Sequence, residues 1–256
     1  MTRLLHMLGA TVLAMAETIG GMTVLVAQLT FNTLLFRLDG RETWRNLYKV
    51  GVKSFPIVVV TALLVGAIMV IQTGQLVAEF DAFGLLGWGA GFATLREVGP
   101  VMIGLMFSGR VGANNTAELG TMKVTEQVDA LRALAIDPMP YLLVPRYVAI
   151  VTMMLLLTII GDLTALFGGA MTAKALLGVD PRLFYFSIEE YIVVGDFLNG
   201  LVKAFFFGIA IATVSCHFGM ATSGGAVGVG RAVNNSVVAA AASIFVFDYI
   251  ITFVLK

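Results

Sequence analysis

SGRVGANNTAELGTMKVTEQVDALRALAIDP, residues 108–138, is the one long polar interruption inside an otherwise apolar chain. Within it Val124, Val128, Leu131 and Ala135 recur at the spacing of one helix face, whereas most charged residues fall on other faces. This pattern predicts a short amphipathic helix. A helix of about 10 to 14 residues, roughly 15 to 21 Å, is too short to cross an apolar bilayer core of roughly 30 Å, so it should lie beside a membrane.

Residues at both ends of the polar stretch predict where this helix begins and ends. Thr125 is suited to cap the N-terminus, and Glu126 and Asp129 would lie in the first turn, where the helix dipole favours acidic side chains. Asp137 followed by Pro138 would end the helix.

The composition indicates an integral membrane protein. The chain has 256 residues, of which 59% are hydrophobic and only 12% charged, and its mean hydropathy is +0.94. Soluble domains carry about 25% charged residues, so a single polytopic, all-α membrane domain over residues 1–256 is expected. The formal net charge of +0 gives no global field that would favour nucleic acid. The lone Cys216 excludes an internal disulfide.

The N-terminal 54 residues are predicted to form an interfacial and basic region. Residues 4–36 are apolar but diluted by polar side chains, which favours an interfacial helix; a spanning helix, or a signal peptide cleaved near residues 14–16, are the alternatives. Five basic residues then recur every four positions around Trp44 and Tyr48: Arg37, Arg41, Arg45, Lys49 and Lys53. We call them the basic stripe, and by the positive-inside rule we expect it at the cytoplasmic membrane surface.

Five spans are expected in the core, residues 55–256. Four are predicted at residues 55–77, 148–170, 192–216 and 237–255. The remaining span, second in chain order, has an apolar run of only residues 98–107 and must therefore include Arg96 and Glu97. The glycine-rich residues 221–236, which include Arg231, are predicted to form a flexible turn before the last span. With five spans the N-terminus would be cytoplasmic and the C-terminus external.

Charged residues inside the spans are the most informative chemistry. Helical rise places Glu97, Lys203 and Asp248 near one depth, about 17 to 20 Å from a membrane surface. Charges there cost several kcal/mol unless they are paired or hydrated, so these residues, with Arg96 nearby, are predicted to form a polar cluster. It would line a cavity or, alternatively, act as a structural ion pair that joins three helices. Asp162 and Asp196 should lie nearer the outer face and be solvated.

No catalytic or metal-binding residues are predicted. The glycine-rich residues 224–230 lack the GxxxxGK[ST] pattern of a phosphate-binding loop and are expected to be part of a turn. His6, Cys216 and His217 do not provide three or four metal ligands, and no nucleophile–base arrangement is recognisable.

Residues 96–146, REVGPVMIGLMFSGRVGANNTAELGTMKVTEQVDALRALAIDPMPYLLVPR, closely resemble the MlaE-type permease family. The elements GPV, GR-G, AELGTM, TEQ-DAL and DP-YL--PR occur in order at the family's spacing, and length and span pattern extend the resemblance over essentially the whole chain. The family also includes the permeases of mycobacterial Mce systems and a chloroplast lipid importer.

The resemblance implies an ABC-transporter permease that moves phospholipids between the bacterial inner membrane and the periplasm or outer membrane. It implies a homodimer with an N-terminal elbow helix and five spans per subunit. The partners would be cytoplasmic ATPase subunits, a periplasmic MCE-domain protein expected to form a hexameric ring, and in some systems a small STAS-type subunit. ATP and Mg²⁺ would be bound by the ATPase, and this chain would carry no cofactor.

The family's functional positions map onto this sequence as follows. A lipid pocket at the dimer interface would use Arg96, Glu97, Lys203 and Asp248. A cytoplasmic coupling helix, near residues 118–134, would contact the ATPase through Glu118, Lys123, Thr125, Glu126, Gln127, Asp129, Leu131 and Arg132. Two other functions stay open from the residues alone: an ion-coupled secondary transporter that uses the intramembrane charges, and a non-transporting membrane scaffold.

Overall fold

The computed structural model describes residues 2–35 and 39–255, so Arg37 of the basic stripe lies outside the described residues. Within these two ranges the chain is built from helices, and no strand occurs in them. In chain order the helices are α1 (Thr2–Leu34), α2 (Gly40–Glu79), η1 (Phe83–Leu85), α3 (Leu86–Ala93), η2 (Thr94–Val98), α4 (Gly99–Phe107), η3 (Ser108–Gly112), α5 (Ala113–Val124), α6 (Gln127–Ala133), η4 (Met139–Leu143), α7 (Val144–Leu177), α8 (Pro181–Tyr191), α9 (Val194–Met220) and α10 (Gly225–Val254).

Five helical stretches of the described chain are long and apolar enough to cross a membrane, which confirms the predicted number. They are Gly40–Glu79, Phe83–Val124, Met139–Leu177, Val194–Met220 and Gly225–Val254. The second stretch joins η1, α3, η2, α4, η3 and α5. It includes Arg96 and Glu97, as predicted from the shortness of its apolar run.

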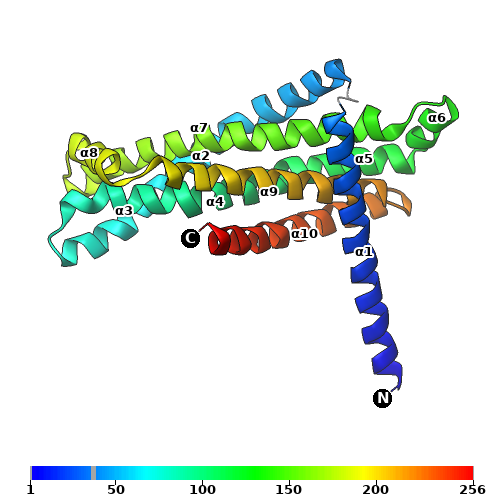
Figure 1. The fold of residues 1–256 in the computed structure, drawn as a ribbon, viewed down its shortest axis with the longest axis horizontal. Helices are drawn as coiled ribbons and strands as arrows, with labels where there is room; N and C mark the ends of the chain where they lie inside the picture. Colours follow the sequence, from blue (N-terminus) through cyan, green and yellow to red (C-terminus); the bar gives the residue numbers. More distant parts are fainter. Residues whose placement is uncertain (1, 36–38, 256) are drawn as a thin grey trace.

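The spanning helices lie side by side along the longest axis of the molecule, whereas α1 runs across them and extends beyond the bundle (Figure 1). The C-terminal half of α1 contacts α7 and α9: Leu29 is buried, and the hydroxyls of Thr30 and Tyr147 lie 3.4 Å apart. An orientation across the bundle suits a helix in the membrane interface, and that location stays a prediction.

Small residues allow α2 and α7 to pack closely along their length. Ala62 and Ala165 are buried at this contact, and a Cβ at Gly66 would collide with the carbonyl oxygen of Ala165. A Cβ at Gly168 would likewise meet the carbonyl oxygen of Leu63. Glycine and alanine are common where transmembrane helices approach backbone to backbone, so this pair forms a rigid unit of the bundle.

The polar stretch contains η3, α5 and α6, and its amphipathic part is shorter than predicted. Helix α5 continues the second span to Val124, and the chain then reverses through Glu126, which has a left-handed backbone at φ 59°. Thr125 does not cap the next helix, because its hydroxyl donates to the carbonyl of Thr121 at the end of α5. The amphipathic helix is therefore α6, with seven residues.

The predicted flexible turn at residues 221–236 is also wrong. Only residues 221–224 lie outside a helix, and α10 begins at Gly225. Gly224 and Gly225 have positive φ values of 84° and 69°, which glycine adopts without strain, so the chain can enter α10 after a short connection. Gly228 is buried, and a Cβ there would collide with the carbonyl oxygen of Ser223, so this glycine lets α10 pack against the connection before it.

Candidate functional site

Lys203 is the centre of an ion-pair network that joins three segments of the chain. Its side chain is only 2% exposed, and its ammonium group contacts the Glu97 carboxylate of η2 and lies 2.9 Å from Asp248 Oδ1 of α10. Thr252 Oγ1 also donates to Glu97 Oε1 across 3.4 Å. The structure thus brings together the predicted residues Glu97, Lys203 and Asp248, and we call them the charge cluster.

A π-helical turn in the second span presents Glu97 to Lys203. Pro100 has no N–H group and cannot bond to the carbonyl of Arg96, while the N–H of Gly99 bonds to the carbonyl of Thr94 five residues back. Gly200 of α9 packs directly on this turn, because a Cβ there would collide with the carbonyl oxygen of Leu95. Lys203 lies one helical turn after Gly200 and so faces Glu97.

Arg96 lies on the same π-helical turn but forms a separate set of contacts. Its Nη1 donates to Asp196 Oδ1 at 3.1 Å, and its Nη2 donates to the carbonyl oxygen of Leu255 at 3.3 Å. The guanidinium also lies 5.4 Å from the centre of the Phe92 ring. Arg96 therefore neighbours the charge cluster along the chain, but its ion pair is with Asp196.

The expectation that Asp196 and Asp162 are simply solvated is wrong for both. Asp196 accepts hydrogen bonds from Arg96 and from the backbone N–H of Val193 at the start of α9. Asp162, on α7, is 1% exposed, and neither carboxylate oxygen has a hydrogen-bond partner among the described residues. The prediction used only the distance of each residue from the end of its span. Access to water depends instead on whether neighbouring helices cover the side chain.

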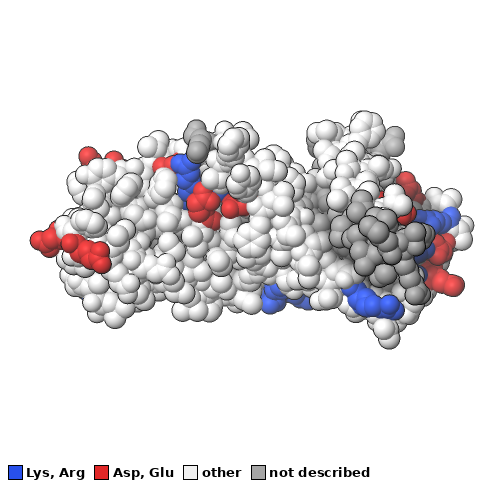
Figure 2. Space-filling model, turned by 90° about the horizontal axis from the view of Figure 1, so that it is seen from below, with Lys and Arg blue, Asp and Glu red and all other residues white. Residues whose placement is uncertain are grey.

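The charge cluster is enclosed on one side and open on the other. The side chain of Glu97 is 35% exposed and that of Asp248 is 23% exposed, whereas Lys203 is covered. An external polar group could therefore contact the two carboxylates without displacing the helices that bury Lys203. Between the two ends of the molecule, most of the surface in Figure 2 is uncharged, and a mixed group of basic and acidic side chains interrupts it.

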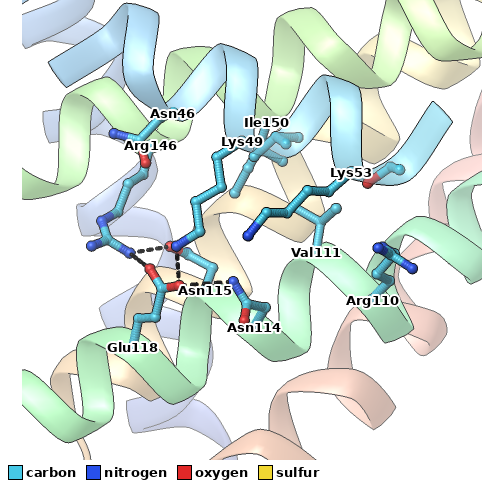
Figure 3. A pocket seen from close by; sticks show the side chains of 12 residues that line it. Asn46, Lys49, Lys53, Arg110, Val111, Asn114, Asn115, Glu118, Arg146 and Ile150 are labelled. Atoms are coloured by element: carbon cyan, nitrogen blue, oxygen red, sulfur yellow. Dashed lines mark hydrogen bonds and ion pairs between the residues drawn. The ribbon is translucent and has the colours of Figure 1, made fainter. Parts of the chain in front are cut away.

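A second polar site, missed from the sequence, lies between α2, η3, α5 and α7. Glu118 forms ion pairs with Lys49 and with Arg146, the latter at 3.1 Å, and Asn114 Nδ2 donates to the same carboxylate at 2.9 Å (Figure 3). These side chains line a cavity of about 240 Å³. The residues come from three different parts of the chain, and no local sequence pattern connects them.

The basic stripe divides between this cavity and the protein surface. A spacing of four residues on a helix of 3.6 residues per turn rotates by about 40° at each step. Arg41 and Arg45 are accordingly exposed, and Arg45 pairs with the nearby Glu42. Lys49 and Lys53 turn toward the cavity.

The predicted coupling residues occupy two different environments. Glu118 lies in α5 and faces the cavity, whereas Lys123, Asp129 and Arg132 form exposed ion pairs around α6, with Lys123 Nζ 3.2 Å from Asp129 Oδ2. Gln127 donates to the hydroxyl of Thr125.

The apolar residues of this region divide in the same way. Val128 is fully buried, and Leu131 is only partly exposed. Leu134, which is 70% exposed, and Ile136 instead present an apolar surface at this end of the molecule.

Comparisons with known proteins place the whole core in one group. A family model described as Permease MlaE matches residues 43–254. A probable ABC transporter permease protein of Rickettsia typhi is 38% identical over 208 residues, which cover 81% of this chain and 80% of the relative. Another probable ABC transporter permease protein, from Synechocystis sp., is 33% identical over 90% of this chain and 88% of the relative. The chloroplastic protein TRIGALACTOSYLDIACYLGLYCEROL 1 of Arabidopsis thaliana is 32% identical over 90% of this chain and 65% of the relative.

Proposed function

The chain belongs to the MlaE permease family and is the permease subunit of a transporter, and we propose that this transporter moves phospholipids, using ATP that a separate partner ATPase hydrolyses. The charge cluster is the observation that supports the lipid substrate most directly. A phospholipid needs an apolar surface for its acyl chains and polar groups for its headgroup. Glu97 and Asp248 are partly exposed carboxylates in an otherwise apolar span region, with Arg96 on the same turn as Glu97.

The placement of charges supports an orientation with α6 in the cytoplasm. The end of the molecule opposite α6 carries mainly acids: Glu79, Asp81, Asp180, Glu189 and Glu190, against Lys174 and Arg182. The α6 end carries most of the basic residues. Cytoplasmic segments of membrane proteins are enriched in lysine and arginine, so this end is assigned to the cytoplasm. We therefore propose that the protein lies in the bacterial inner membrane, with its N-terminus inside and its C-terminus on the periplasmic side.

The assembly we propose is a homodimer that carries an ATPase at the α6 end and an MCE-domain protein, with or without a STAS-type subunit, as accessory partners. Nucleotide-driven closure of the ATPase would push α6 and the turn after it, and the two subunits would then rearrange around a lipid pocket. The outward face of α10 supports a subunit contact, because it exposes Phe245, Tyr249 and Phe253 within the least covered of the five spans.

The test begins with the tagged chain purified from its native membrane together with its bound partners. We expect co-purifying ATPase activity and extractable phospholipid. Reconstituted Glu97→Gln should reduce phospholipid transfer between vesicles about tenfold or more, since hydrogen bonds to a charged group contribute about 1.5 to 3 kcal/mol.

Glu79→Gln is the matched control, because Glu79 is an exposed acid at the end of α2, outside the charge cluster. Normal transfer by a folded Glu97→Gln protein would contradict the assignment of Glu97. Transfer that follows an ion gradient and needs no ATP would instead indicate an ion-coupled transporter.

A further inference from the structure

The cavity between α2, η3, α5 and α7 has a strong excess of positive charge. Its lining includes four basic side chains, Lys49, Lys53, Arg110 and Arg146, and a single acidic one, Glu118. None of these residues belongs to the charge cluster around Lys203, so the cavity is a separate site.

Glu118 satisfies only half of these basic groups. Its Oε1 accepts from Lys49 and Asn114, and its Oε2 accepts from Arg146 at 3.1 Å. Lys53 and Arg110 have no ion pair or hydrogen bond with any described residue, and in Figure 3 no dashed line reaches either of them. These two unpaired cations give the cavity a net positive charge, which attracts an anion.

The donors define the chemistry of the missing partner. Lysine and arginine side chains donate hydrogen bonds and accept none, and a guanidinium matches the paired oxygens of a phosphate. Lys53 and Arg110 are exposed, so a ligand can reach them, whereas Arg146 is mostly covered and fixed by Glu118 and Asn115.

Apolar side chains also line the cavity, namely Val50, Val111 and Ile150. These would suit the carbon atoms next to a phosphate diester. Basic pockets between transmembrane helices near a membrane surface are known to take lipid headgroups.

We infer that this cavity binds a phosphate group, held by Lys53 and Arg110 and supported by the Lys49–Glu118–Arg146 network. A phosphate diester of an anionic lipid headgroup and free inorganic phosphate share this chemistry, and the experiment below separates them. The inference goes beyond the proposed function, because it requires neither transport nor ATP hydrolysis.

The test measures equilibrium binding of short-chain phosphatidylglycerol to the full chain, with its bound partners, in a non-ionic detergent. We expect binding to weaken with salt, and the Lys53→Gln/Arg110→Gln double variant to bind at least about tenfold more weakly, because two charge-assisted contacts are lost. Lys174→Gln/Arg182→Gln removes the same charge at exposed positions at the opposite end of the bundle and should bind as the unaltered protein does.

A change of opposite sign separates binding from a merely structural role. Glu118→Gln removes the only carboxylate of the cavity and should strengthen phosphatidylglycerol binding, whereas a loss of structure would weaken it. If the double variant does not fold, Lys53→Gln alone provides the same comparison, since Lys53 is exposed and has no described partner.

Competition identifies the source of the phosphate. Displacement of phosphatidylglycerol by inorganic phosphate at similar concentration would support a free-phosphate site, and resistance to it would support a headgroup site. Equal binding by the double variant and the control, or no binding of either probe to the unaltered protein, would overturn the inference.

Discussion

Lys203 shows how a single buried cation constrains three helices. Because its ammonium group is covered while both partner carboxylates remain partly exposed, most of the desolvation falls on the lysine. The ion pairs with Glu97 and Asp248 compensate for the desolvation of the lysine. Without the lysine, the two carboxylates would have no cation beside them. The same residue is therefore a structural requirement and a fixed positive charge beside any bound headgroup.

Replacement of this cation should destabilise the protein measurably. Lys203→Met keeps the length of the side chain but leaves Glu97 and Asp248 without their cation, so we expect the free energy of unfolding to fall by about 3 kcal/mol. Denaturation in detergent, followed by circular dichroism, measures this, with the exposed Lys174→Met as the control. Addition of Glu97→Gln to Lys203→Met should recover part of the loss; a Lys203→Met protein as stable as the original would contradict the role of the pair.

Asp162 presents the opposite case, a buried carboxyl without a partner among the described residues. Burying a carboxylate without a partner costs several kcal/mol of desolvation free energy, and burying an amide of nearly the same shape costs less. We therefore expect Asp162→Asn to leave the thermal unfolding midpoint unchanged or to raise it. A decrease as large as that of Lys203→Met would show that the charge of Asp162 is stabilised in the fold.

At the scale of single residues, the sequence predicted which intramembrane charges meet but not all of their partners. Helical rise placed Glu97, Lys203 and Asp248 at one depth, and the cost of an unpaired charge there favoured their pairing. The partner of Arg96 depends on the rotation of α9 and on a π-helical turn, which a regular helical count does not contain. No sequence pattern connected Arg110 and Arg146 with Lys49 and Glu118, since their cavity forms only when α2, α5 and α7 pack.

At the scale of elements, the contact between α2 and α7 depends on residues without side chains. Gly66→Ala would place a Cβ against the carbonyl oxygen of Ala165, so the helices must separate, and we expect a loss of about 1 to 3 kcal/mol in the free energy of unfolding. Gly195→Ala, in the open first turn of α9, is the control and should have little effect. Equal unfolding midpoints for the two variants would mean that the contact is looser than described.

The turn after α6 is the element we expect to contact the ATPase. Leu134 is the more exposed of its apolar residues, so Leu134→Asp should reduce co-purification of ATPase activity without lowering the unfolding midpoint. Val193→Asp places the same charge at an exposed apolar position at the other end of the bundle and should leave co-purification intact. Full retention of the ATPase by Leu134→Asp would argue against coupling through this turn.

The sequence predicted this element by its polarity but not by its geometry. The spacing of Val128 and Leu131 indicated one amphipathic helix, and α6 exists. Its boundary at Glu126 could not be foreseen, because a left-handed backbone is rare for glutamate and reflects the reversal of the chain against α5. The exposed apolar residues Leu134 and Ile136 follow the end of α6, so the helical spacing of apolar residues could not predict them.

At the scale of the whole molecule, the unequal distribution of charge between the two ends is the basis of the proposed orientation. Four of the five spans were evident from their long apolar windows, whereas the second has only a short apolar run and was predicted by including Arg96 and Glu97. The shape of the bundle depends on contacts such as those of Gly66 and Gly168. The orientation rests on the acidic end near α8 and the basic end near α6. It is testable without any functional assay.

Cys216 makes the unaltered protein a suitable background for this test, because its thiol is fully buried and should not react with a membrane-impermeant maleimide. Glu190→Cys, exposed on α8, should be labelled in intact spheroplasts, since that end faces the periplasm in the proposed orientation. Ser223→Cys, exposed between α9 and α10 at the other end, should be labelled only after the membrane is opened. The reverse pattern would place α6 outside the cytoplasm, where no ATPase could reach it, and the proposed coupling would fail with it.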